Sequence, residues 1–399
     1  MTRVIIETLG CKLNQAESET LWRNLSAAGY QVIGAVESAD VLILNTCTVT
    51  HIADRKARQA VRNAVKHNPG ISVIVAGCYA ETAGVSLLTL PNVRAVPGNA
   101  AKQSMVAELK RLGFLPMLEP DSSDPSRNRS LIKIQDGCDH RCSYCIVPLV
   151  RPVKSCVPPD AVIDEVMRRQ AEGCREIVLT GTEIGEYTND GHSLETLLRR
   201  ILDQTSIERI RISSLQPQEV TPELIGLWRD RRLCRHFHLS LQSGSDSVLG
   251  RMRRRYDTAR YRGIVEQIRS HIPDVAITTD IIAGFPGESE AEFEESYRFI
   301  ESLEFSRLHV FPYSPRPGTV AELMPDRIDS RIVKVRVDRL LRLGHHCEAE
   351  FKRRFHGRAL DVLFENKEGD EWVGYSDNYI RVTTRSETPL ANQIIEIRL

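Results

Sequence analysis

Strand-like and helix-like patterns alternate along the first 115 residues. Short apolar runs such as VLILNTC (41–47) and SVIVAGC (72–78) are typical of buried strands, and apolar residues recur at helical spacing over 53–67 and 101–112. Strands that alternate with helices favour a parallel sheet with helices on its faces. We therefore predict an N-terminal parallel α/β domain over residues 1–115. Its remaining strand-like runs are RVIIETLG (3–10), YQVIG (30–34) and VRAVPG (93–98).

The rest of the chain divides at a stretch rich in Pro, Ser and Asp, which predicts a linker over residues 116–130. Residues 131–352 contain six strand-like runs, and all but the last lead into a helical pattern before the next run. This favours a partial (β/α)6 barrel with its chemistry at the carboxyl ends of the strands. From 353 to 399 short apolar runs alternate with turn sequences, which predicts a small all-β barrel. The six central runs are LIKIQDG (131–137), EIVLTG (176–181), RIRISS (209–214), FHLSLQ (237–242), AITTDIIAGF (276–285) and RLHVFPY (307–313).

Composition and charge narrow the class of protein. The apolar runs are far too short to span a membrane, and the start MTRVIIETLG lacks the pattern of an export signal, so we expect a cytoplasmic protein. Ten cysteines in a reducing compartment favour metal or redox chemistry over disulfides. The formal net charge is zero, yet residues 55–66 carry five Lys or Arg and no acid. Such a run either binds phosphate or is a solvated helix face.

The strongest chemical signal is the loop QDGCDHRCSYC, in which Cys138, Cys142 and Cys145 have C-x3-C-x2-C spacing. Cysteine thiolates hold iron–sulfur clusters, usually four of them, so three leave one iron open to a small molecule. A structural zinc site is closed by four ligands, and His140 is the only other ligand in the loop. The loop follows the first strand of the predicted barrel, where an active site is expected.

This loop resembles the signature of the radical S-adenosylmethionine (SAM) superfamily, C-x3-C-x-aromatic-C, with Tyr144 as the aromatic residue. The resemblance implies a [4Fe–4S] cluster whose open iron binds the amino and carboxylate groups of SAM. Electron transfer to SAM then yields a 5′-deoxyadenosyl radical, which attacks C–H bonds beyond the reach of acid–base chemistry. No residue is expected to act as a general acid or base.

Three further cysteines each end a strand-like run of the first domain. Cys11, Cys47 and Cys78 follow RVIIETLG, VLILNT and SVIVAG. Ligands of an open parallel sheet bind outside the carboxyl ends of its strands, so these residues should converge in space. Packing as small apolar residues is the alternative, and the cluster loop elsewhere in the chain favours a metal site.

The motifs GCKLNQAES, NTCTVT, AGCYAE and DGCDHRCSYC together resemble the radical SAM methylthiotransferase family over essentially the whole chain. The resemblance implies a second [4Fe–4S] cluster on Cys11, Cys47 and Cys78, and a C-terminal TRAM-like barrel. The stretch around Cys47 is most similar to the branch that modifies tRNA. It implies conversion of N6-threonylcarbamoyladenosine to its 2-methylthio derivative beside the anticodon, with SAM as methyl donor and radical source. The implied partners are the tRNA anticodon loop and an electron donor such as flavodoxin or ferredoxin.

The resemblance also implies residues that contact SAM. Thr182 and Glu183, after the second barrel strand, match the position that meets its amino group. Gln242 and Ser243, after the fourth strand, match contacts to the carboxylate or ribose, and Arg253 is a candidate for the carboxylate. Each of these residues has loop structure as its alternative explanation.

The sequence departs from the family pattern in two places. Residues 151–157 read RPVKSCV, where relatives carry R-G-x-x-R-S-R, and Cys156 there is a possible fourth cluster ligand. Residues 359–399 hold four Lys or Arg against eight Asp or Glu, which excludes a broadly basic RNA platform. RNA contact would then depend on a few residues, namely Tyr379, Arg381 and Arg385, or on the basic helix before them. Arg316 either faces RNA or substrate, or lies in a proline-rich strand end.

Two other functions stay open at this point. One is a methylthiotransferase that acts on a ribosomal protein, and the other is an iron–sulfur carrier or electron-transfer protein that does not cleave SAM.

Overall fold

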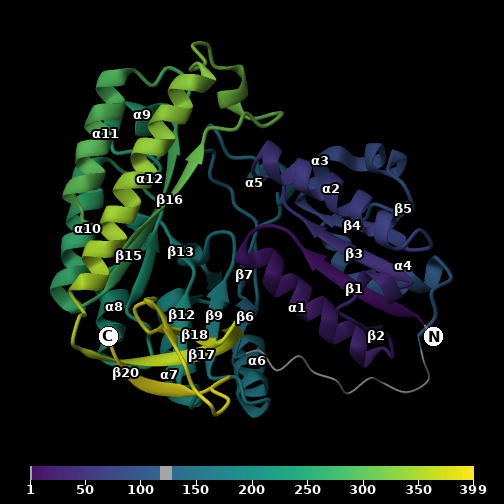
Figure 1. Cartoon of the computed structure of the whole chain (residues 1–399). Coiled ribbons are helices and arrows are strands. Elements are labelled where there is room, and N and C mark those ends of the chain that lie inside the picture. Colours follow the sequence, from purple (N-terminus) through teal and green to yellow (C-terminus); the bar gives the residue numbers. More distant parts are fainter. Residues whose placement is uncertain (1, 117–127) are drawn as a thin grey trace.

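The computed structural model describes residues 2–116 and 128–399, and it confirms the predicted order of a parallel α/β unit, a partial barrel and a small β unit (Figure 1). The first unit is a five-stranded parallel sheet in the order β2-β1-β3-β4-β5. Its strands are β1 (Arg3–Thr8), β2 (Gln31–Val32), β3 (Val41–Thr46), β4 (Ser72–Gly77) and β5 (Val93–Ala95).

Helices cover both faces of this sheet because its central strands are apolar on both sides. All residues of β3 and β4 are buried, as expected for strands between two helical layers. Val41 and Ile43 face one layer, while Leu42 and Leu44 face the other. The first layer holds α1 (Lys12–Ala27) and α4 (Met105–Arg111), and the second holds α2 (His51–His67) and α3 (Cys78–Ala83). The helix predicted over 101–112 begins as a 3-10 turn (Ala100–Ser104).

The six predicted central strands are all present, and the run predicted over 209–214 is divided into two strands, Arg209–Ile212 and Ser214–Leu215. They run parallel in two sheets, β12-β9-β6 and β13-β14-β15-β16, which meet where Ile210 and Leu233 form a bridge. The strands are β6 (Arg129–Lys133), β9 (Glu176–Thr180), β12 (Arg209–Ile212), β13 (Ser214–Leu215), β14 (His236–Leu239), β15 (Ala276–Ala283) and β16 (Arg307–Pro312). The helices are α5 (Val147–Val150), α6 (Pro159–Ala171), α7 (Leu194–Gln204), α8 (Pro222–Ile225), α9 (Asp246–Arg251), α10 (Thr258–His271), α11 (Glu290–Ser302) and α12 (Ser330–Arg353).

The predicted small β unit is a four-stranded antiparallel sheet in the order β19-β18-β17-β20. It packs on the end of α12 through Phe351 and Phe355. Tyr379 stacks on His236 at the start of β14, with ring centroids 4.8 Å apart. Tyr379 therefore packs against the barrel, and its contact with RNA stays a prediction. The strands are β17 (Ala359–Glu368), β18 (Glu371–Ser376), β19 (Arg381–Thr384) and β20 (Ile394–Arg398).

Helix α1 docks the N-terminal unit against the barrel beside β6 (Figure 1). Two buried carboxylates on α1 reach across this boundary. Glu17 pairs with Lys133 at 3.1 Å, and Glu19 accepts a hydrogen bond from the Ser130 hydroxyl. The predicted linker at 116–130 lies mostly outside the described residues, and the domain limits stay predictions.

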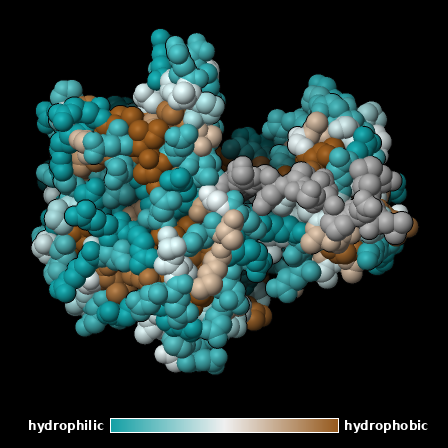
Figure 2. All heavy atoms as spheres, turned by 90° about the horizontal axis from the view of Figure 1, so that it is seen from below, coloured by the Kyte–Doolittle hydropathy of each residue, from teal (hydrophilic) through white to brown (hydrophobic). Residues whose placement is uncertain are grey.

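The two lobes stand apart when the molecule is viewed from the side of the C-terminal sheet, and their surface is mostly hydrophilic with scattered apolar spots (Figure 2). Within the described part of the chain, no helix combines the length and apolar character needed to cross a membrane.

Candidate functional site

Cys11, Cys47 and Cys78 lie at the carboxyl ends of three adjacent parallel strands. Cys11 is the N-cap residue of α1 just after β1, and Cys47 directly follows β3. Cys78 is the first residue of α3 and directly follows β4. Because β1, β3 and β4 are neighbours in the sheet, the three residues share one edge. The structure thus brings together this predicted set.

The three thiols are close enough to influence one another. Burial raises the pKa of the Cys47 thiol to about 12, and the neighbouring Cys11 and Cys78 add to this rise. Gly10 has a φ of +113°, and a Cβ added there would lie 2.4 Å from Cys47 Cβ and 3.1 Å from its sulfur. Only glycine therefore lets the chain turn into Cys11 this close to Cys47.

The second triplet lies in one loop, as its spacing predicts. Cys138, Cys142 and Cys145 line a cavity of about 130 Å³ together with Thr182, Glu183 and Arg254. The loop leaves the short hairpin of β7 (Gln135–Asp136) and β8 (Ser155–Cys156).

A buried glutamine fixes the cysteine loop against the loop after β9. Gln135 accepts hydrogen bonds from the backbone N–H groups of Thr182 (2.9 Å) and Glu183 (2.7 Å). Its amide nitrogen donates to the carbonyl of Gly137 at 2.6 Å. Sequence reasoning missed Gln135, because nothing in its strand-like surroundings distinguishes it from a core position.

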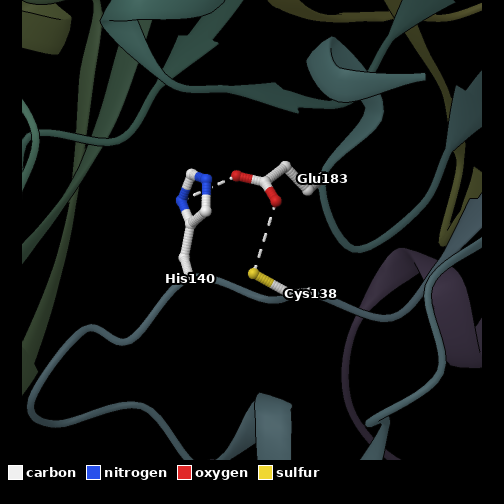
Figure 3. A group of neighbouring side chains, drawn as sticks. All are labelled: Cys138, His140 and Glu183. Atoms are coloured by element: carbon white, nitrogen blue, oxygen red, sulfur yellow. Dashed lines mark hydrogen bonds and ion pairs between the residues drawn. The ribbon is translucent and has the colours of Figure 1, made fainter. Parts of the chain in front are cut away.

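Glu183 and His140 form a polar wall beside Cys138 (Figure 3). The Glu183 carboxylate lies 3.4 Å from the Cys138 sulfur and 2.8 Å from Nδ1 of His140. The hydrogen bond with Glu183 raises the pKa of His140, whose Nε2 lies 2.9 Å from Glu186. Burial, with repulsion from Glu183 and Glu186, raises the pKa of Glu219 to about 8. A cationic group such as an ammonium would be well matched to the carboxyl groups of Glu183, Glu186 and Glu219.

The other predicted SAM contacts differ in where they lie. Tyr144 lines the cysteine cavity and also a neighbouring cavity of about 250 Å³, which Gln242 lines as well. Ser243 is buried, and its hydroxyl accepts from the N–H of Ser245, so its contacts are those of a structural loop residue.

The arginine that reaches the cysteines is Arg254, not its neighbour Arg253. Arg253 is exposed in a left-handed turn with φ +57°. The Arg254 guanidinium lies 3.3 Å from the Cys142 sulfur and 3.4 Å from the Tyr144 hydroxyl. We therefore move the proposed carboxylate contact from Arg253 to Arg254. The tight turn displaces the contact by one residue, which sequence spacing does not reveal.

The two triplets are joined through α5. Cys78 packs against Ile146, which directly follows Cys145, and against Val150, the last residue of α5. Arg151 comes next, and its Nε lies 3.4 Å from the Cys78 sulfur.

Arg151 is a buried ionic link between the two domains. Its guanidinium pairs with Glu17 of α1 at 2.8 Å and with Asp136 of β7 at 2.7 Å. Burial alone would lower the pKa of Arg151, but Glu17, Cys78 and Asp136 raise it well above its usual range. Residues 151–157 depart from the family pattern, but Arg151 retains the first arginine of that pattern. The sequence did not reveal the role of this arginine.

Arg316 lies in the proline-rich loop after β16, which ends at Pro312 as one alternative predicted, and it is also a buried domain contact. Its buried side chain pairs with Asp54 of α2 at 2.7 Å and donates to the Thr48 hydroxyl at 2.8 Å. It holds the loop after β16 against the segment that follows Cys47.

Cys156 lies in β8 and accepts from the N–H of Thr188, and it is not among the residues that line the cysteine cavity.

Both cysteine sets fit [4Fe–4S] clusters with three protein ligands. Three thiols meet at each site, and cationic Arg254 and Arg151 lie beside one sulfur of each set, where they would offset the negative charge of thiolate-bound iron. The glycine at position 10 keeps the space beside Cys47 free of a side chain.

Comparison with known proteins agrees with this architecture. Residues 3–98, which contain the first triplet, match the model described as uncharacterized protein family UPF0004. Residues 132–300, which contain the second, match the radical SAM superfamily. The described fold resembles the solved structure of the radical SAM methyltransferase TsrM from Kitasatospora setae, with a TM-score of 0.57 and 15% identity over 78% of this chain and 73% of that one. Fold and site thus define a radical SAM protein with an added N-terminal cysteine domain.

Full-length relatives narrow the class. The chain is 35% identical to the threonylcarbamoyladenosine tRNA methylthiotransferase MtaB of Bacillus subtilis, over 100% of this chain and 94% of the relative. It is 36% identical to the protein of the same name from Thermotoga maritima, over 96% of this chain and 91% of the relative. The chain belongs to the radical SAM methylthiotransferase family.

Proposed function

We propose that this enzyme converts N6-threonylcarbamoyladenosine in the anticodon loop of a tRNA to its 2-methylthio derivative. Cys138, Cys142 and Cys145 would hold one [4Fe–4S] cluster, and Cys11, Cys47 and Cys78 the other. The bound clusters and SAM supply a 5′-deoxyadenosyl radical and a methylated sulfur for transfer to C2 of the adenine. An electron donor such as flavodoxin or ferredoxin would reduce the enzyme in the cytoplasm.

The observation that carries the proposal is the nearness of two cysteine triplets, one at the carboxyl ends of β1, β3 and β4 and the other in the loop that leads into α5. A single triplet suffices for radical formation, whereas sulfur insertion needs a second metal site close to the first. The packing of Cys78 on Ile146, beside Cys145, provides that closeness. The printed names of the full-length relatives support tRNA as the substrate.

The side chains around the first site suit SAM. The Glu183 carboxylate would hold the ammonium group of SAM, and the Arg254 guanidinium would hold its carboxylate. Tyr144 lines this cavity and also the larger one beside it. An anticodon-loop base is single-stranded, so the target adenine can be turned out at modest cost.

Nucleoside mass spectrometry of bulk tRNA tests the proposal. A strain that lacks this chain should lose 2-methylthio-N6-threonylcarbamoyladenosine and accumulate the unthiolated nucleoside, and the wild-type gene should restore it. An unchanged level of the methylthio nucleoside would contradict the proposal and favour the ribosomal protein as substrate. An iron–sulfur carrier would form no 5′-deoxyadenosine after anaerobic reconstitution with SAM and reductant.

A further inference from the structure

Two neighbouring cavities lie between the domains, and they differ in chemistry. The inner chamber, of about 250 Å³, has walls from both cysteine sites: Val49 and Thr50 follow Cys47, and Tyr144 and Ile146 flank Cys145. Phe311 adds a further apolar wall. A largely apolar space lined by residues next to both triplets suits a purine ring.

The outer chamber, of about 400 Å³, adjoins the inner one. The two cavities share Pro312 and Tyr313 in their linings, so they lie on two sides of the same residues. The loop after β16 lies against the N-terminal domain, where Arg316 pairs with Asp54 and Ser314 contacts His51. The outer lining contains three basic residues, His51, Arg327 and Lys334, and no acidic residue.

These basic groups are available to an anion. Among the described residues, no ion pair or hydrogen bond of the Lys334 ammonium is recorded, and its side chain is exposed. Arg327 donates one hydrogen bond to the carbonyl of Glu322 at 2.7 Å, which leaves most of its guanidinium donors free. The nearby carboxylates Asp54 and Asp329 are engaged by other arginines.

We propose that the outer chamber binds the carboxylate of the threonylcarbamoyl group, with Lys334 and Arg327 as its charge partners. This inference rests on the proposed function and names the feature of the substrate that the site reads. The threonylcarbamoyl group is attached through N6 at C6, whereas the reacting atom is C2, and the two bonds leave the same six-membered ring in directions about 120° apart. When C2 faces the cysteines in the inner chamber, the N6 substituent extends away from them and toward the basic residues.

Backbone phosphates of the RNA have a different surface available. Arg55, Lys56, Arg62 and Lys66 project from α2 to solvent and do not line either chamber. Sequence-independent RNA contact is suited to such an open basic face. Lys56 therefore provides a matched control for Lys334, since both are exposed lysines on long helices.

The test is a binding measurement with the reconstituted enzyme, without reductant, on three anticodon stem-loop RNAs. The target nucleoside is N6-threonylcarbamoyladenosine, the same nucleoside with the carboxylate converted to a carboxamide, or plain adenosine. The wild type should bind the carboxylate RNA about tenfold more tightly than the carboxamide RNA, the usual size of a charge-assisted hydrogen bond. Lys334→Met and Arg327→Gln should bring this ratio close to one, whereas Lys56→Met should weaken binding of all three RNAs equally.

Three results overturn the inference: no carboxylate preference in the wild type, a preference that survives in both chamber variants, or equal weakening of all three RNAs by Lys334→Met. The last result would assign the chamber to backbone phosphate. Circular dichroism and iron content of each variant show that the fold and the clusters are intact. An activity assay distinguishes failure of this inference from failure of the proposed function. If the proposed function were wrong, the wild type would form no methylthio product on the threonylcarbamoyl RNA when reductant is added.

Discussion

The two cysteine sites are built in opposite ways. Cys138, Cys142 and Cys145 lie within eight consecutive residues of one loop, so local sequence alone sets their spacing. Cys11, Cys47 and Cys78 come from three loops, and only the order of β1, β3 and β4 brings them together. The site of Cys138, Cys142 and Cys145 therefore depends on one loop, whereas the site of Cys11, Cys47 and Cys78 depends on the sheet and on its docking to the barrel.

The largest contrast is expected when each triplet is removed. Replacing Cys138, Cys142 and Cys145 by Ala should abolish formation of 5′-deoxyadenosine, because SAM then has no iron to bind. Replacing Cys11, Cys47 and Cys78 by Ala should leave SAM cleavage in place and abolish only methylthio transfer. Liquid chromatography of anaerobic reactions measures both products. Equal loss of cleavage in the two triple variants would show that the sites do not divide the work in this way.

Arg151→Met tests whether the second site depends on domain docking. It leaves Glu17 and Asp136 without their shared buried partner, so the free energy of unfolding should fall by about 3–5 kcal/mol. Arg175→Met removes a surface pair with Glu208 and should cost about 1 kcal/mol or less. Urea unfolding of the metal-free proteins compares them. A loss for Arg151→Met no larger than that for Arg175→Met would contradict the role of Arg151 as a domain link.

Two glycines allow each site to be disturbed separately. A Cβ at Gly10 would collide with Cys47, and a Cβ at Gly137 would lie 2.1 Å from the Val153 carbonyl oxygen. Both positions have positive φ, so alanine is strained there by roughly 1 kcal/mol or more. Gly10→Ala should lower iron content with SAM cleavage retained, whereas Gly137→Ala should lower cleavage. Iron content and 5′-deoxyadenosine formation are measured on the same preparations, and a reversed pattern would refute the assignment.

The smallest expected effect is a difference in acid sensitivity. Burial would raise the pKa of Glu17, but Arg151, Lys102 and Lys133 hold it well below its usual value of 4.5. A carboxylate with a depressed folded-state pKa contributes stability above its unfolded pKa, and that contribution is lost as the pH falls through the folded pKa. Urea midpoints of the metal-free protein should therefore fall as the pH drops below about 4.5, and less steeply in Glu17→Gln. Identical pH slopes would exclude Glu17 as the source.

Sequence patterns predicted much of the fold and both cysteine sets. Apolar runs located the strands, and the order of a parallel sheet then placed Cys11, Cys47 and Cys78 at one edge. The contacts between domains could not be predicted in this way. Arg151 and Arg316 reach partners more than a hundred residues away, and nothing near them in sequence marks those partners.

Local backbone geometry explains another difference. A left-handed residue turns the side chain of Arg253 outward and brings Arg254 to Cys142. Spacing within RMRRRYD gives no sign of that turn. Gln135 was missed because a buried polar residue within an apolar run shows its partners only in the folded chain.

The most direct test of the two-site account is the iron and sulfide content of anaerobically reconstituted protein. The wild type should bind about eight iron atoms per chain, four for each cubane cluster, and the Cys11, Cys47 and Cys78 triple variant about four. Equal iron content in the two proteins would contradict a second cluster at the edge of the N-terminal sheet.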